Sequence, residues 1–287
     1  MKPGRFSYEA PETIEAALAS LALRGDDAKV IAGGQSLAPM LNMRLARPEH
    51  LIDINGLKQL GEIRLDGDRL TIGAMVRHAA LAKSELIHRH CPMLAHAAET
   101  IGHYAIRQRG TLGGSLAHAD PAAQLPLAAL VLDAEIEIWS AAGERTVPAR
   151  EFFVSIFTTV INPDELIVAV HVPATRPRDG WGFRLFNRRA GDFAIVSVAA
   201  TLRRADDGTI ERLRLAIGGI GPVPVRVERL VAAEVASRMS TDWSATIAAK
   251  VSDVEIEDNE RTPINFRREL VAALTRDALD QALENAR

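Results

Sequence analysis

The stretch AGGQSLAPMLNMRLARPEHLIDI, residues 32–54, places a paired-glycine turn between a short apolar run and a helical segment. We expect a strand ending at Ala32, a helix over 37–45 and a second strand over 51–54. Glycine has no Cβ, so the backbone N–H groups of Gly33 and Gly34 can approach a ligand closely. The first turn of the following helix adds unpaired amides with partial positive charge. These features predict a pyrophosphate seat; the alternative is a plain tight turn with Ser36 as the helix N-cap.

A second glycine pair occurs in TLGGS, residues 111–115, where the hydroxyls of Thr111 and Ser115 flank the glycines. A dinucleotide is long enough to need two contact sites, so the two turns together favour a dinucleotide ligand. Neither turn has the spacing Gly-x-Gly-x-x-Gly, and a Rossmann nicotinamide site is therefore not supported. The next segment has Asp120 before Pro121, which predicts an N-cap and first residue for a helix that ends at Leu132.

The rest of the chain alternates helical and strand patterns in the manner of an α+β protein. Ile14, Ala17, Leu18 and Leu21 recur at helical spacing before Gly25. Strands are predicted over 62–65, 69–73, 135–139, 165–172, 181–187, 194–203 and 211–218, and helices over 92–101, 227–238, 243–250 and 266–286. The Pro-rich, charged stretch 173–180 is the best linker candidate. We therefore expect two domains, 1–175 with lobes of about 1–55 and 56–175, and a smaller domain over 176–287.

The bulk composition excludes several classes of protein. The chain has 287 residues, 47% hydrophobic and 25% charged, with a formal net charge of −3, so it does not look like a nucleic-acid binder. No apolar run approaches the roughly 20 residues of a membrane span. The N-terminal stretch is charged and unlike a signal peptide, so we expect a cytoplasmic protein. The single Cys91 excludes an internal disulfide and a cysteine-held iron–sulfur cluster.

Two further clusters of side chains could carry chemistry. His88, His90, Cys91 and His96 lie close together, but their spacing fits no standard zinc pattern, so we expect a solvated helix end and no metal. The consecutive arginines at 188 and 189 are open to two interpretations: contact with a ligand or partner, or a solvated strand end.

The two glycine motifs resemble the FAD motifs of the carbon monoxide dehydrogenase medium subunit and its relatives. AGGQSLAPMLNMRLARPEHLIDI is similar to the first, and IRQRGTLGGSLAHADPAAQLP to the second. The similarity continues through RLTIGAMVRHAAL, FNRRAGDFAIVSVAATL and FRRELVAALTRDAL, and so covers essentially the whole chain in order. This family also contains the flavin subunits or domains of nicotine, caffeine and xanthine dehydrogenases and of 4-hydroxybenzoyl-CoA reductase.

The resemblance implies a two-lobed FAD-binding domain of the vanillyl-alcohol oxidase (PCMH) type, followed by a smaller α+β domain with an antiparallel sheet packed on helices. It places the pyrophosphate on the backbone of 32–36, the isoalloxazine near Ile101 and Phe193, and its pyrimidine edge within reach of Arg184. The implied FAD-binding residues are Ala32, Gly33, Gly34, Gln35, Ser36, Leu37, Ile101, Thr111, Gly113, Gly114, Ser115, His118, Asp120, Gln124, Arg184, Asp192 and Phe193.

The chain departs from the family pattern at a few of these positions. Relatives often have isoleucine and asparagine where this chain has Leu112 and Ser115, a carboxylate where it has Gln124, and tyrosine or tryptophan where it has Phe193. None of these changes removes a backbone contact, so the expectation of FAD binding stands.

The resemblance also implies a role and partners. The chain is expected to be the FAD-binding electron-transfer subunit of a molybdenum hydroxylase, beside a large subunit with the molybdenum cofactor and a small 2Fe-2S subunit, in a heterotrimer that a twofold axis doubles. It would take electrons from the iron–sulfur clusters and pass them to an external acceptor, with no catalytic side chain of its own. Two alternatives remain: a stand-alone FAD-dependent oxidoreductase of the same fold, and a non-catalytic partner that uses the glycine turns structurally.

Overall fold

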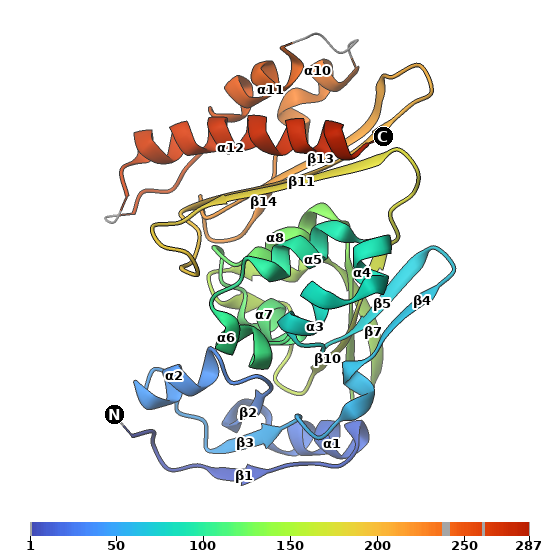
Figure 1. Cartoon of the computed structure of the whole chain (residues 1–287). Helices are drawn as coiled ribbons and strands as arrows, with labels where there is room; N and C mark the ends of the chain where they lie inside the picture. Colours follow the sequence, from blue (N-terminus) through green and yellow to red (C-terminus); the bar gives the residue numbers. More distant parts are fainter. Residues whose placement is uncertain (1, 237–241, 260–261, 287) are drawn as a thin grey trace.

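The computed structural model describes residues 2–236, 242–259 and 262–286, which form three layers stacked along the long axis of the molecule (Figure 1). The first layer is a small parallel sheet of order β1-β3-β2 with two helices. Its elements are β1 (Ser7–Glu9), α1 (Ile14–Arg24), β2 (Ala28–Ile31), α2 (Leu37–Asn42) and β3 (His50–Asp53). Ile14, Ala17, Leu18 and Leu21 are buried under α1, which confirms the helix that their spacing predicts.

The middle layer is a five-stranded antiparallel sheet of order β4-β5-β10-β6-β7. Its strands are β4 (Ile63–Asp66), β5 (Arg69–Gly73), β6 (Glu135–Ser140), β7 (Gly143–Pro148) and β10 (Leu166–Pro173). The helices that accompany the sheet are α3 (His78–Lys83), α4 (Glu85–His90), α5 (Pro92–Glu99), α6 (Tyr104–Arg109), α7 (Leu112–His118), α8 (Gln124–Val131) and α9 (Ala149–Phe152). A small hairpin, β8 (Phe153–Ser155) and β9 (Thr158–Thr159), completes the layer.

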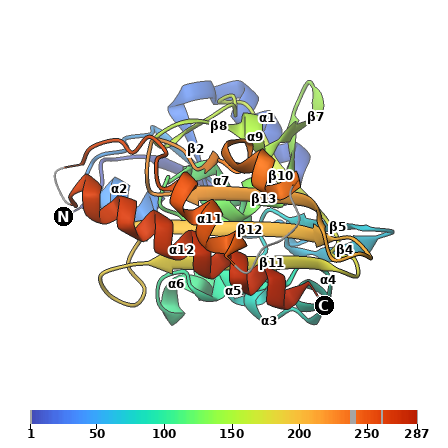
Figure 2. The same cartoon turned by 90° about the horizontal axis from the view of Figure 1, so that it is seen from above.

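The third layer is an antiparallel sheet of order β11-β12-β13-β14 with helices on its outer face (Figures 1 and 2). Its elements are β11 (Asp179–Phe186), β12 (Val196–Arg204), β13 (Ile210–Gly218), β14 (Val225–Arg226), α10 (Ala232–Ala236), α11 (Trp243–Val251) and α12 (Ile264–Asn285). The long helix α12 lies close against β11, because a Cβ on Gly180 or Gly182 would come within 1.9 Å of a backbone oxygen of α12.

The hydrophobic core continues from the middle layer into the third. One cluster of buried side chains contains Leu127 and Ala128 of α8 together with Phe183, Ala199 and Ala216 of the outer sheet. The inner face of the outer sheet is therefore apolar along much of its length and is covered by the middle layer. A second cluster fills the space between this sheet and α10–α12, and a third lies under α1.

Several local expectations were wrong. The helix predicted from Asp120 begins at Gln124, because the Asp120 carboxylate accepts a 2.9 Å hydrogen bond from the N–H of Ala122 and so closes a turn before the helix. The strands β1, β7, β8, β9 and β14 and the short helices α3, α4, α6, α7 and α9 were not predicted. The second glycine pair, expected in a turn, lies in the first turn of α7. The helix predicted over 227–238 is a 3₁₀ turn, Glu228–Val231, followed by α10, and residues 237 and 238 lie outside the described residues.

The linker candidate 173–180 is shorter than expected, since β10 includes Pro173 and β11 begins at Asp179. No helix within the described ranges is long and apolar enough to cross a membrane.

Candidate functional site

The first glycine turn packs against the Arg109 backbone of the second motif and has unpaired backbone N–H groups. Gly34 has a φ of 70°, which favours glycine. Gly33 has no such φ; a Cβ there would lie 2.1 Å from the carbonyl oxygen of Arg109. Glycine is therefore favoured for different reasons at the two positions: by backbone conformation at Gly34 and by close packing at Gly33. Across the described part of the chain, the backbone N–H groups of residues 33–36 have no protein acceptor, so they are available to a ligand.

The second glycine turn is built differently, because its amides are already used. Thr111 caps α7 and its hydroxyl accepts a 3.1 Å hydrogen bond from the N–H of Gly114. The N–H groups of Leu112 and Gly113 donate to backbone oxygens at the end of β5, and that of Ser115 donates to the oxygen of Thr111. Both glycines permit packing, since a Cβ on Gly113 would touch Ala74 and one on Gly114 would touch the Thr111 hydroxyl. The two turns are therefore not equivalent.

Arg77 joins the two turns. Its guanidinium donates to the carbonyl oxygen of Arg109 at 2.5 Å and to the Asn55 side-chain oxygen at 2.6 Å. The Asn55 amide in turn donates to the carbonyl oxygen of Ala32 at 2.8 Å. Burial and the nearby Arg109 lower the pKa of Arg77, while Asp53 opposes this. This chain of contacts, here called the Arg77 bridge, fixes the first turn relative to the end of α6.

The next residue, His78, contacts the second turn through its ring. Its buried ring lies with Nε2 2.9 Å from the carbonyl oxygen of Thr111 and 3.2 Å from the Ser115 hydroxyl oxygen. Burial lowers the pKa of His78 to about 4, with a smaller contribution from Arg107 and Arg77 and an opposing one from the Thr111 carbonyl. The ring is therefore neutral near pH 7, and a hydrogen on Nε2 donates to Thr111.

A third segment, 101–103, approaches the second domain. The Arg107 guanidinium donates to the carbonyl oxygens of Ile101 at 2.8 Å and Gly102 at 3.0 Å, which fixes this turn. In the loop between β11 and β12, a Cβ on Gly191 would lie 2.6 Å from the His103 ring, so this loop packs directly on the turn. The loop therefore extends from the third layer toward the side of the molecule where α2 and α6 lie (Figures 1 and 2).

The loop also carries Asp192 and Phe193. Phe193 is 60% exposed, which leaves its ring available to a ligand. The N–H of Asp192 donates to the Arg189 carbonyl within the loop. The structure thus brings four of the predicted segments toward one side: the first turn, the second turn, Ile101, and this loop.

The remaining predicted residues have other partners. The His118 ring stacks on Phe157 with 4.8 Å between ring centroids, and burial lowers the pKa of His118. Gln124 is buried, with one long contact of 3.4 Å to the Thr100 carbonyl. The Arg184 guanidinium donates to Gln281 of α12 at 2.5 Å, and none of its hydrogen bonds within the described residues reaches the glycine turns.

Gln35 and Leu37 stay with the first turn, where the Gln35 amide donates to the Gly33 carbonyl at 3.0 Å. Sequence reasoning missed three residues that hold the turns in place: Asn55, Arg77 and His78. Asn55 follows the second predicted strand and the other two follow the RLTIG strand, so position at a strand end was the only signal. Within the described residues no group of three or more His, Cys, Asp or Glu side chains could hold a metal.

Comparison with known proteins identifies the architecture. Residues 4–175 match the family model described as FAD binding domain in molybdopterin dehydrogenase, and residues 181–282 match the CO dehydrogenase flavoprotein C-terminal domain. The 6-hydroxypseudooxynicotine dehydrogenase complex subunit alpha of Paenarthrobacter nicotinovorans is 41% identical over 100% of this chain and 97% of its own length. The carbon monoxide dehydrogenase medium chain of Hydrogenophaga pseudoflava is 38% identical over 79% of each chain.

Two solved structures resemble the chain along its whole length. A chain of carbon monoxide dehydrogenase from Hydrogenophaga pseudoflava superposes with a TM-score of 0.94 at 34% identity, covering 99% of both chains. A chain of quinoline 2-oxidoreductase from Pseudomonas putida 86 gives a TM-score of 0.93 at 32% identity, covering 100% of this chain and 99% of that one. The predicted fold class, an α+β FAD-binding domain followed by a smaller α+β domain, is confirmed.

Proposed function

The chain belongs to the family of FAD-binding medium subunits of molybdenum hydroxylases, and from this premise we propose that its first glycine turn holds the FAD pyrophosphate while its second domain covers the flavin. The chain is thus a flavoprotein subunit of a dehydrogenase complex, an oxidoreductase with an electron-transfer role. The observation that carries the proposed site is the row of unpaired amides at residues 33–36 beside a position where no Cβ can be placed.

The donor set fits this ligand. A pyrophosphate carries negative charge and accepts hydrogen bonds, and free amides at a glycine turn supply donors without a charged side chain. The Arg77 bridge holds these donors in a fixed orientation before a ligand arrives, which lowers the entropic cost of binding. Thr111 and Ser115 lie beside this seat on the neighbouring motif, and we assign them to polar atoms of the same ligand.

The remaining proposed contacts orient and cover the flavin. Ile101 lies in the turn that Arg107 fixes, and Phe193 lies in the loop that packs on the adjoining His103. An aromatic ring exposed over such a turn can stack on a flat heterocycle and exclude water from one face. FAD, when bound, supplies the redox chemistry; the protein positions it and tunes its surroundings. Gly113, Gly114, His118, Asp120, Gln124, Arg184 and Asp192 complete the proposed set as residues that shape or border the site.

The relatives are subunits of multi-subunit dehydrogenases, so this chain is a component of such an assembly. We propose a heterotrimer with a molybdenum-cofactor subunit and a 2Fe-2S subunit, doubled by a twofold axis as is common in oligomers. In this assembly the chain receives electrons from the iron–sulfur subunit and delivers them to an external acceptor. A cytoplasmic location is part of the same proposal.

Reconstitution tests this role. The isolated chain should bind FAD and pass electrons from a chemical reductant to a dye, yet oxidise no aromatic heterocycle, aldehyde or carbon monoxide. Its single cysteine cannot hold an iron–sulfur cluster, and its described residues offer no metal site for hydroxylation. Adding the two partner subunits should restore substrate turnover and give a heteromer on size-exclusion chromatography.

Two outcomes would contradict the proposal. Substrate oxidation by the isolated chain at a rate like that of the complete complex would favour a stand-alone flavoenzyme. Failure of the purified chain to bind FAD, with unchanged assembly, would favour a structural role for the glycine turns.

A further inference from the structure

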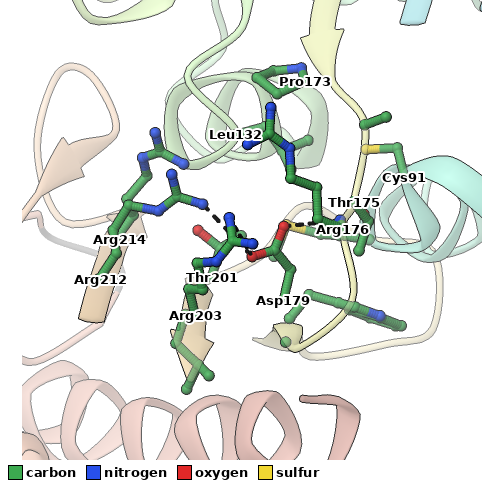
Figure 3. Close-up of a pocket in the computed structure, with 15 residues that line it drawn as sticks. Cys91, Leu132, Pro173, Thr175, Arg176, Asp179, Thr201, Arg203, Arg212 and Arg214 are labelled. Carbon is green, nitrogen blue, oxygen red and sulfur yellow. Dashed lines mark hydrogen bonds and ion pairs between the residues drawn. The ribbon is translucent and has the colours of Figure 1, made fainter. Parts of the chain in front are cut away.

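A cavity of about 140 Å³ lies between the middle layer and the third layer, among residues that the flavin proposal does not use (Figure 3). A water needs only about 10–15 Å³ of such volume, so the cavity has room for a small polyatomic ligand. Cys91, Met93 and Leu132 form an apolar wall on the side of the middle layer. Four arginines also line the cavity: Arg176, Arg203, Arg212 and Arg214.

The register of the outer sheet explains why the arginines gather. In the β12–β13 pair Arg203 lies opposite Arg212, and Thr201 lies opposite Arg214. In the β11–β12 pair Asp179 lies opposite Arg203. Side chains two residues apart share a face of a strand, so these residues extend the inner face of the sheet beyond its apolar part. A directly opposed arginine pair destabilises a sheet unless negative charge lies nearby.

The protein supplies only part of that negative charge at close range. Asp179 is the one carboxylate among the described residues that line the cavity, and its Oδ1 lies 3.9 Å from Arg203 and 3.8 Å from Arg212. Its other oxygen accepts a 2.9 Å hydrogen bond from the N–H of Arg176.

The other carboxylates near these arginines lie outside the lining. Arg176 pairs with Asp68, Arg214 with Asp133, and Arg203 with Glu211 at 3.5 Å. For Arg212, the contact with Asp179 is the one ion pair found in the described part of the chain, and it is too long for a hydrogen bond.

Two donors in the cavity, the Arg212 guanidinium and the Thr201 hydroxyl, are left without a close acceptor among the described residues. Asp179 Oδ1 is a buried acceptor that has no hydrogen-bond partner there either, and the guanidinium groups of Arg203 and Arg212 approach it only to 3.9 and 3.8 Å. Burial lowers the pKa of Arg214, Arg212 and Arg226 add to this, and Asp133 opposes it. An anion between the arginines would satisfy the free donors and screen the opposed pair.

We propose that this interdomain cavity is a binding site for a small, multiply charged oxyanion of the phosphate class, held by Arg212, Arg203 and the Thr201 hydroxyl. Arg176 and Arg214 flank it, and the Asp179 carboxylate lies 3.9 Å from the Arg203 guanidinium and 3.8 Å from that of Arg212. Because the cavity is lined by residues of both domains, the anion ties the third layer to the middle layer. The site does not depend on the proposed flavin function.

Calorimetric titration of the full-length, FAD-loaded protein with inorganic phosphate tests the proposal. FAD loading keeps the probe out of the pyrophosphate seat, and ionic strength is held constant with sodium chloride because salt screens exposed charges. We expect one saturable site. Arg212→Gln should weaken it roughly tenfold or more, as loss of a hydrogen bond to a charged group does, and Thr201→Val several-fold. Arg150→Gln, which removes an exposed arginine elsewhere, should leave the affinity unchanged.

Melting in phosphate-free buffer gives a second readout. If the opposed pair costs stability, Arg212→Gln should melt no lower than the parent protein, and phosphate should raise the melting temperature of the parent but not of the variant. A lower melting temperature for Arg212→Gln together with no saturable binding to the parent would show that the cluster is only a structural ion network. Saturable binding of equal strength in Arg212→Gln and Thr201→Val would place the anion elsewhere. Either result overturns the cavity site, and neither bears on FAD binding.

Discussion

A methyl group added at Gly33 would push the two glycine motifs apart. A Cβ there would approach the Arg109 carbonyl oxygen to 2.1 Å, so Gly33→Ala must push the first turn away from α6. The free amides of residues 33–36 would then leave the orientation that the Arg77 bridge gives them. We expect the purified variant to lose most of its FAD, as measured by flavin absorbance per protein. Gly61→Ala is the matched control, since nothing lies within 4 Å of its Cβ position; equal FAD content in both variants would place the pyrophosphate elsewhere.

His78 gives the protein a specific sensitivity to acid. Its pKa is about 4 in the folded protein against 6.5 for the free group, so the unfolded state binds the proton more readily between these values. The stability that the neutral ring contributes is fully present above about pH 6.5 and is lost as pH falls toward about 4. Between about pH 7.5 and about pH 5 the loss should be about 2 kcal/mol.

Urea unfolding of the parent protein and of His78→Gln at these two pH values measures the effect. Most carboxylates stay ionised at about pH 5, so the difference between the two proteins isolates the histidine. The free energy of unfolding of the variant should fall less on acidification, by about 2 kcal/mol. The same pH dependence in both proteins would mean that His78 is protonated in the folded state or stays solvated.

At the scale of elements, the sequence predicts the helices and strands that a local periodic pattern specifies. The helix spacing of Ile14 to Leu21, the strands on either side of the first glycine turn and the long C-terminal helix follow from periodicity and are present. The short helices α3, α4 and α6 have too few turns to show a period, and their stability comes from packing in the middle layer. The start of α8 was misplaced because the Asp120 side chain closes a turn instead of capping the helix.

The candidate site also combines features that the sequence predicts with features that only the fold reveals. The glycine motifs mark both segments, but the sequence does not show that the amides of Leu112 and Gly113 are already paired, since their acceptors lie in the distant segment that follows β5. Asn55 and Arg77 are distant from the glycine motifs in sequence, and only the fold brings them to Ala32 and Arg109.

The Arg77 bridge joins the end of β3, the entry to α3 and the end of α6, so its loss should loosen the site as a unit. Arg77→Gln removes a partly buried pair of charged hydrogen bonds, worth roughly 1.5–3 kcal/mol. We expect FAD affinity, measured by quenching of flavin fluorescence, to fall roughly 10- to 100-fold. Arg64→Gln, which breaks an exposed pair with Asp66, is the control and should bind FAD normally. An affinity equal to that of the control would show that the bridge does not organise the turns.

At the scale of the whole molecule, the two family models divide the chain near residue 180, yet the hydrophobic core crosses this boundary. Leu127 and Ala128 of α8 belong to one hydrophobic cluster with Phe183, Ala199 and Ala216 of the outer sheet, and each of these five residues is at most 1% exposed. Separating the domains would expose this apolar face to water, at a cost of about 25 cal/mol for each Å² uncovered. The loop that carries Phe193 would also leave the 101–103 turn on which it packs.

We therefore expect the chain to unfold as one cooperative unit. Trp139 packs against the core under α1, and Trp243 is buried in the core between the outer sheet and its helices, so each reports on a different end of the molecule. Two variants, each with the other two tryptophans changed to phenylalanine, give single reporters for a urea titration followed by fluorescence. Coincident midpoints and slopes from Trp139 and Trp243, after correction for the stability of each variant, indicate a single transition. A separate, earlier transition at one reporter would mean that this end of the chain unfolds alone. The apolar face shared by the two domains would then stabilise the contact between them less than the separate cores stabilise each domain.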